Sequence, residues 1–291
     1  MKAFVLAVGI LLLGLAMPTV PLPRTVYDYI VVFDISQSMN VEDYQLDGAR
    51  IGRLDYAREA TRQVLRKLPC GSRIGWGAFT GNRTLLLLSP VEVCANYNDL
   101  LASLAQIDGR MRWAEASEIV KGLRWAIEAA QSTPTTPNLV FVSDGQEAPP
   151  LEGLDLQSVL EKVKDHSVHG WIIGAGGDEP SPIPKIDTEG NHHGFWRPDE
   201  VIQSESTADG ATPGLEHYSA LREPHLTSLA HLLNLDYARL SDAKSLSAAM
   251  TDDRFGRRRQ VPTDLSWLAE ALALLLLIVR FRPAVPKLKA W

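Results

Sequence analysis

The stretch Tyr29–Ser38 (YIVVFDISQS) decides the fold, because it joins a buried strand to a cluster of polar side chains. Its first five residues are aromatic or β-branched, which is typical of a strand buried on both faces of a parallel sheet. Residues 53–68 follow with apolar side chains at helical spacing. Strands and helices continue to alternate up to residue 250. The sequence therefore predicts an α/β domain with a doubly wound, mostly parallel sheet.

The remaining segments fit this alternation and add one hairpin. Apolar runs at 73–79 and 84–88 flank the turn Gly81-Asn82, so the second run is expected to be an antiparallel edge strand. Residues 176–222 are rich in Gly, Pro, Ser and Asp and are too long for an ordinary loop, which predicts an insertion. The other expected elements are helices at 98–107, 117–130, 156–164, 224–233 and 243–250, and strands at 138–143, 168–174 and 236–240.

Polar residues follow the first strand in the pattern Asp34-x-Ser36-x-Ser38. The carboxyl ends of the strands form the ligand-binding edge of such a sheet, and these three side chains can face a common point there. One carboxylate and two hydroxyls suit Mg²⁺ or Mn²⁺. From these residues alone the alternative is equally open, namely that Asp34 caps the next helix and the serines shape a turn.

Two later residues are expected at the same edge. Asp144-Gly145 follows the strand at 138–143, and Ser117 begins a helix after a loop that can bring its hydroxyl to this edge. In this order the residues resemble the metal-ion-dependent adhesion site of von Willebrand factor A (vWA) domains, over about residues 28–250. The resemblance implies that a Mg²⁺ ion, or Mn²⁺ or Ca²⁺, is held by the following residues: Asp34, Ser36, Ser38, Ser117 and Asp144.

The resemblance also implies a function, because such an ion keeps an open coordination position that an Asp or Glu of a partner protein completes. Three departures from the family pattern stand out. Ser117 replaces the usual threonine, and Gln37 stands where glycine is frequent. Glu118 adds a carboxylate, either beside the ion or simply in the first turn of a helix, where the helix dipole favours it.

Within the family the sequence is most similar to membrane-anchored bacterial vWA proteins, in stretches such as residues 31–43 (VVFDISQSMNVED) and 226–242 (LTSLAHLLNLDYARLSD). One such group comprises the vWA accessory proteins encoded with periplasmic methanol dehydrogenase, which residues 110–123 (RMRWAEASEIVKGL) favour. This likeness implies an accessory or maturation factor for the quinoprotein dehydrogenase, acting in its assembly or calcium insertion. The alternative group is the aerotolerance family, which implies a stress-related scaffold.

The two ends of the chain are apolar. Residues 3–17 carry no charge, and we expect 1–23 to be a signal peptide or an N-terminal membrane anchor ahead of a vWA domain at 24–252. After a linker at 253–264, residues 265–281 are expected to form a transmembrane helix. The basic tail at 282–291 is then cytoplasmic by the positive-inside rule. The expected location is the bacterial inner membrane, with the vWA domain facing the periplasm.

The two cysteines fit this compartment. Cys70 ends a helix before one strand of the hairpin and Cys94 follows the other strand, so both are expected at the edge of the sheet opposite the metal residues. A disulfide between them is geometrically feasible and suits an oxidising periplasm. The alternative is two unrelated buried thiols.

Composition and motifs also bear on the function class. With 29 basic and 35 acidic residues the net charge is −6, which argues against a nucleic-acid binder. We expect a binding module, not an enzyme; the rival interpretation is a metal-dependent hydrolase with Glu118 or Glu147 as base. A second metal site is not expected, because none of the candidate residues has the His-x₃-His spacing of a zinc ligand pair: His192, His193, His217, His225, His231 and Asp178.

Overall fold

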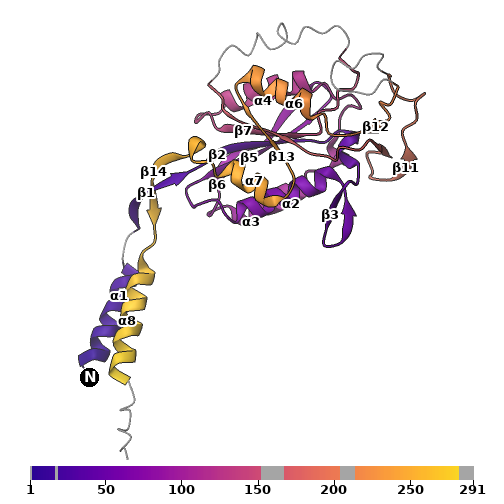
Figure 1. The fold of residues 1–291 in the computed structure, drawn as a ribbon. Helices are drawn as coiled ribbons and strands as arrows, with labels where there is room; N and C mark the ends of the chain where they lie inside the picture. Colours follow the sequence, from indigo (N-terminus) through magenta and orange to yellow (C-terminus); the bar gives the residue numbers. More distant parts are fainter. Residues whose placement is uncertain (1, 17–18, 152–166, 204–213, 282–291) are drawn as a thin grey trace, which may run out of the picture. The chain divides into compact units, whose positions relative to one another are not determined.

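The computed structural model describes residues 2–16, 19–151, 167–203 and 214–281. The chain forms two compact units, one of residues 25–257 and one that combines residues 1–24 with 258–291 (Figure 1). The predicted helix at 156–164 and the predicted cytoplasmic tail at 282–291 lie outside the described residues.

A six-stranded sheet forms the centre of the larger unit, with the strand order β13-β8-β7-β2-β5-β6. Strand β6 runs antiparallel to β5 at one edge, and all other neighbours are parallel. This confirms the predicted doubly wound sheet with one antiparallel edge strand. The strand bounds are β2 (Asp28–Asp34), β5 (Arg73–Thr80), β6 (Arg83–Glu92), β7 (Asn138–Ser143), β8 (Gly170–Gly174) and β13 (Asp236–Arg239).

Helices cover both faces of the sheet (Figure 1). One face carries α2 (Arg53–Leu65), α3 (Tyr97–Gln106) and α7 (Ala243–Met250); the other carries α4 (Ile119–Gln131) and α6 (Glu223–Leu233). Strand β2 lies between the two layers. Its Tyr29, Val31 and Phe33 side chains pack in the first core. Ile30 and Val32 pack in the second core. Because both faces of β2 are buried, residues 29–33 are apolar at every position and do not alternate between apolar and polar.

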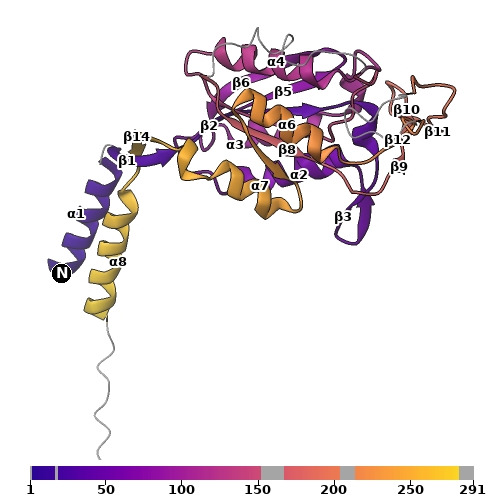
Figure 2. The ribbon, with the colours of Figure 1, turned by 45° about the horizontal axis from the view of Figure 1, so that its top comes forward.

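The larger unit also contains short strand pairs, which the sequence did not predict. Strands β3 (Tyr44–Leu46) and β4 (Ala49–Ile51) form a hairpin. The segment 176–222, predicted only as an insertion, contains two antiparallel pairs: β9 (Ser181–Pro182) with β12 (Tyr218–Ser219), and β10 (Pro184–Ile186) with β11 (His192–Phe195). Figure 2 shows these four strands gathered at one end of the sheet.

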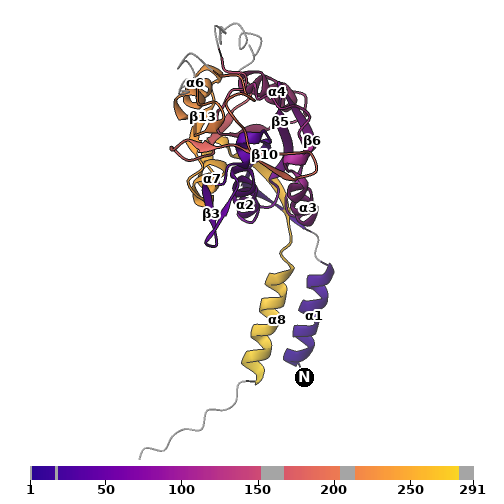
Figure 3. The same cartoon turned by 90° about the vertical axis from the view of Figure 1, so that its right-hand side faces the viewer.

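The smaller unit consists of α1 (Lys2–Ala16), β1 (Val20–Val26), β14 (Arg257–Thr263) and α8 (Ser266–Phe281). Strands β1 and β14 pair in a two-stranded sheet, so the predicted linker at 253–264 is largely a strand. Helices α1 and α8 lie side by side (Figure 3). A Cβ atom added to Gly14 would lie 2.9 Å from Cβ of Ala269, so glycine permits the close helix contact.

The expected transmembrane helix at 265–281 is not supported, and neither is a membrane-spanning anchor among the described residues of 1–23. Helix α8 has 16 residues and α1 has 15. Within the described ranges, no helix combines the length and the apolar character needed to cross a membrane.

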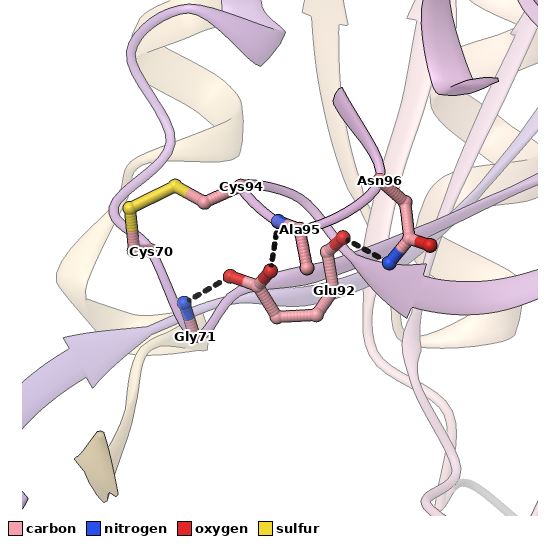
Figure 4. The surroundings of a disulfide bond; sticks show 6 residues. All are labelled: Cys70, Gly71, Glu92, Cys94, Ala95 and Asn96. Carbon is pink, nitrogen blue, oxygen red and sulfur yellow. Dashed lines mark hydrogen bonds between the residues drawn. A yellow bond between two sulfur atoms is a disulfide. The ribbon is translucent and has the colours of Figure 1, made fainter. Parts of the chain in front are cut away.

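The predicted disulfide between Cys70 and Cys94 is present, with Cα atoms 5.2 Å apart (Figure 4). The Glu92 carboxylate also links the two segments that carry the cysteines. It accepts hydrogen bonds from the backbone N–H groups of Gly71 (2.6 Å) and Ala95 (2.5 Å). The bond joins the segment after α2 to the end of β6, and therefore ties the edge strand to the helix layer.

One buried cation connects three separate segments of the larger unit. The Arg53 guanidinium is fully buried at the first turn of α2 and donates to Oδ2 of Asp144 at 2.7 Å. It also donates to Oδ2 of Asp43 at 2.7 Å and to the Ser219 hydroxyl at 2.6 Å. The backbone N–H of Gly177 donates to the same Asp43 oxygen. Both ends of the segment 176–222 are therefore held to the sheet through Arg53.

Replacing Cys70 and Cys94 together with serine should lower the free energy of unfolding. The disulfide closes a loop with a sequence separation of 24 residues, and the chain-entropy model gives about 3.5 kcal/mol for such a loop. Urea denaturation of the full chain measures the effect. Adding a reductant should destabilise the wild type by a similar amount and leave the double variant unchanged; a variant that stays sensitive to the reductant would contradict this assignment.

Replacing Arg53 with methionine should cost about 3–5 kcal/mol of stability, because it leaves the buried Asp144 and the partly buried Asp43 without their cation. The matched control is Arg62→Met. Arg62 forms a half-exposed i,i+3 pair with Glu59, and such pairs contribute less than about 1 kcal/mol. Chemical denaturation compares the two variants. Equal losses would show that the Arg53 network does not stabilise the fold.

Candidate metal centre

Asp34 is the last residue of β2 and is fully buried. Its Oδ1 accepts a hydrogen bond from the backbone N–H of Ser36 at 2.9 Å, and its Oδ2 accepts one from the Ser143 hydroxyl at 2.7 Å. Burial and the negative charge of Asp144 raise the pKa of Asp34 to about 7. The carboxylate is therefore held rigidly at the carboxyl edge of the sheet, between the ends of β2 and β7.

Ser36 and Ser38 lie at the start of a short 3-10 helix that follows Asp34. Their hydroxyl oxygens are 3.2 Å apart and both residues are buried. Two neighbouring ligands of an octahedral Mg²⁺ ion, each about 2.1 Å from it, lie about 3 Å apart. The spacing of the two hydroxyls is therefore close to that of adjacent ligands on one ion.

Ser117 is brought to the same edge by backbone hydrogen bonds on both sides. Its N–H donates to the carbonyl oxygen of Ala148 at 2.7 Å, and the N–H of Ala148 donates back at 2.8 Å. The N–H of Gly81, at the end of β5, donates to the carbonyl oxygen of Ala116 at 2.7 Å. The loop before α4 is thus held between the segments that follow β5 and β7.

The Ser117 hydroxyl is buried and has no hydrogen-bond partner among the described residues. A buried hydroxyl without a partner is costly. Ser36, Ser38 and Ser117 line one pocket of about 270 Å³. The structure therefore brings together the three predicted hydroxyl ligands, and this set of hard oxygen donors fits Mg²⁺ or Mn²⁺.

Asp144 lies in a different setting. Its Oδ2 accepts from Arg53 and from the Ser219 hydroxyl (2.8 Å), and its Oδ1 accepts from the backbone N–H of Gln146 (3.0 Å). Neither Asp144 nor Asp34 lines the pocket itself. The charge of Asp144 is therefore balanced by Arg53, a residue that the sequence analysis placed only at the start of a helix.

The acidic residues considered as bases have other partners. Glu118 forms an ion pair with Lys121 and does not line the pocket. Glu147 does line it, but its oxygens accept from the N–H groups of Ile119 (2.9 Å) and Val120 (3.2 Å) at the start of α4, and Oε1 contacts His225 at 3.1 Å. Burial raises the pKa of Glu147.

The histidines do not gather into a second centre in the parts of the chain that the structure describes. The one group of three potential ligands there is Cys70, Glu92 and Cys94, whose thiols form the disulfide. His193 pairs with Asp187 on the surface.

Two glutamines that the sequence analysis did not assign to the site hold the segment 176–222 above it. The Gln37 amide donates to the carbonyl oxygen of Ile186 at 2.9 Å and accepts from the N–H of Ile186 at 3.2 Å. The Gln146 amide donates to the carbonyl oxygens of Glu216 (3.0 Å) and Tyr218 (3.2 Å). One feature of the sequence could have indicated this contact, namely that Gln37 stands where the family often has glycine.

The segment 176–222, held by these two glutamines, forms one wall of the pocket. Its wall on the side of the segment 176–222 includes the apolar residues Ile183, Trp196, Val201 and Ile202, together with Glu200 and Glu216. The hydroxyls therefore share a pocket with a wall that is apolar in large part. Figure 3 looks onto this end of the domain, where β10 lies in front of the sheet.

Comparisons with known proteins agree with this architecture. Residues 29–146 match the family model described as von Willebrand factor type A domain. The sequence has no match among curated proteins.

Two solved structures are similar to this chain over most of its length. An aerotolerance-related membrane protein from Bacteroides fragilis is 20% identical with a TM-score of 0.57, and the match covers 78% of this chain and 98% of that chain. The conserved hypothetical protein BatB from Bacteroides thetaiotaomicron is 18% identical with a TM-score of 0.55 and the same coverages. At these identities the likeness shows a shared fold. Residues 29–146 of this chain therefore match a vWA domain on a vWA-like fold, and the five predicted ligand residues all lie within this matched range.

Proposed function

We propose that this vWA domain holds a divalent cation through Asp34, Ser36, Ser38 and Ser117, and that the ion binds an acidic side chain of a partner protein. The observation that carries the proposal is the Ser117 hydroxyl, which is buried without a hydrogen-bond partner among the described residues in the pocket that it shares with Ser36 and Ser38. A cation coordinated by all three hydroxyls supplies that partner.

The charge balance of the site favours a partner with a carboxylate. Asp144 is paired with Arg53, so it contributes to the ion through its charge or through a bridging water, and Asp34 is the main anionic ligand. An ion with one carboxylate and several hydroxyl ligands keeps most of its positive charge and still attracts a further anion. Mg²⁺ is the proposed ion, with Mn²⁺ or Ca²⁺ as substitutes.

We propose binding and not catalysis as the role of this ion. A hydrolase would need a base beside the metal-bound water. The two candidate bases have other partners, since Glu118 pairs with Lys121 and Glu147 caps α4 and contacts His225.

The proposed location is the periplasmic side of a bacterial inner membrane. The disulfide supports an oxidising compartment. Apolar side chains of α1 and α8 are exposed, among them Leu12 (62%) and Leu275 (56%), which supports attachment to the membrane through these helices. One of the similar solved structures, from Bacteroides fragilis, is described as a membrane protein.

Two classes of partner protein are compatible with this proposal. One is a quinoprotein methanol dehydrogenase, for which the chain acts as an assembly or calcium-insertion factor. The other is an aerotolerance-related scaffold, which is supported by the description of the similar protein from Bacteroides fragilis. The neighbouring genes distinguish the two: genes of methanol oxidation beside this one support the first.

Replacing Ser117 with alanine should weaken Mg²⁺ and Mn²⁺ binding at least about tenfold, because it removes one ligand of the ion. Stability in the presence of a chelator should not fall, since the hydroxyl makes no hydrogen bond in the described structure. Calorimetric titration of the purified full chain measures the affinity.

Two variants serve as controls. Ser117→Thr keeps the hydroxyl and should keep the affinity. Ser228→Ala removes an exposed hydroxyl on α6 that bonds to the Pro224 carbonyl oxygen, and it should not change metal binding. If the wild type takes up neither ion, the proposed function is wrong.

A further inference from the structure

Gln146 lines the same pocket as the three hydroxyls, and its amide oxygen is buried without a partner among the described residues. Gln146 is 4% exposed, and its Nε2 faces the carbonyl oxygens of Glu216 and Tyr218. Because Nε2 must point at those acceptors, the orientation of the amide is fixed. Its Oε1 is buried and has no hydrogen-bond partner among the described residues. This oxygen can be satisfied by an N–H donor of a ligand.

Trp196, one of the lining residues from the segment 176–222, carries a buried donor. The indole Nε1–H of Trp196 makes no hydrogen bond within the described part of the chain. The residue is held in place, because its backbone N–H donates to the carbonyl oxygen of Ile183 at 3.0 Å and the Lys185 ammonium lies 4.6 Å from its ring centroid. The indole can be satisfied by a carbonyl oxygen of a ligand.

The shape of the pocket limits the size of that ligand. About 270 Å³ is at or below the lower end of the roughly 300–1,000 Å³ typical of small-molecule sites. The aliphatic side chains of Ile183, Val201 and Ile202 form part of the wall. The pocket therefore suits one or two side chains, of which at least one is apolar.

From these features we infer that the occupant is an extended acidic segment of the partner protein, bound through its backbone as well as its carboxylate. This inference rests on the proposed function for the ion. Each peptide residue carries one N–H donor and one C=O acceptor, which match Oε1 of Gln146 and Nε1 of Trp196. The acidic side chain binds the ion, and a neighbouring apolar side chain packs on the aliphatic wall.

The same features disfavour a simple anion as the physiological ligand. An acetate or phosphate ion brings no N–H group for the Gln146 oxygen, and it leaves the apolar wall without a contact. A buried acceptor that stays unpaired in the complex lowers the affinity. A peptide segment satisfies the metal, both polar atoms and the wall at once.

The test uses the full chain and a fluorescein-labelled pentapeptide pool, Gly-Z-Asp-Z-Gly with blocked ends, in which Z is an equimolar mixture of Val, Ile, Leu and Phe. Fluorescence anisotropy should rise in Mg²⁺, and not in a chelator or with the matched pool that has Asn in place of Asp. The Asp pool should bind more tightly than sodium acetate used as a competitor. Methylating the amides beside Asp should weaken binding.

Trp196→Phe isolates the indole contribution, because it keeps an aromatic ring and removes only the donor. Peptide affinity should fall about 3- to 10-fold, the worth of one neutral hydrogen bond, and Mg²⁺ affinity should stay unchanged. The matched control is Trp113→Phe, which alters a half-exposed indole that does not line the pocket; it should change neither affinity.

The outcomes separate this inference from the proposed function. If Mg²⁺ binds and the Asp pool is no better than acetate, or Trp196→Phe leaves peptide binding unchanged, the peptide inference is overturned and the metal site stands. If the wild type binds no Mg²⁺, both fail.

Discussion

The buried ion pairs of Arg53 are the interaction on which the rest of this domain depends. One guanidinium, fully removed from solvent, joins the first turn of α2, the loop after β7 and the end of the segment 176–222. A buried charge is tolerated only when its partners are all in place. An arginine in the first turn of a helix also opposes the helix dipole, so its position is explained by Asp43 and Asp144 and not by helix formation.

This arrangement decides the electrostatics of the candidate metal centre. Because Asp144 is balanced by Arg53, Asp34 is the one carboxylate of the predicted ligand set that has no cationic side chain as partner among the described residues. Burial and the charge of Asp144 both disfavour its ionised form. A cation held by the three hydroxyls, as proposed above, would offset both effects, and the modest ligand charge would leave the ion attractive to a further carboxylate.

The sequence predicted those features that depend on local pattern. The apolar run of β2, the D-x-S-x-S motif and the disulfide each follow from residue types at short spacing or from sheet geometry. The sequence missed the contacts made across the chain: Gln37 and Ile186 are 149 residues apart, and Arg53 and Asp144 are 91 apart. Strands β9 to β12 have two to four residues, several of them Pro or Gly, and such strands carry no periodicity that a sequence pattern can reveal.

The two glutamines explain why the motif predicts a metal ion but does not predict which partner group would bind to that ion. Gln37 lies between the two serines of the motif, and Gln146 follows Asp144-Gly145. The Gln37 amide binds the segment 176–222 at Ile186, and the Gln146 amide binds it at Glu216. The loops that follow β2 and β7 therefore carry predicted metal ligands and also position the segment that lines the pocket. Under the proposed function, the choice of ligand would thus depend on a segment far from the motif in sequence. A vWA domain with the same metal residues and a different segment at this position would present a different pocket to its partner.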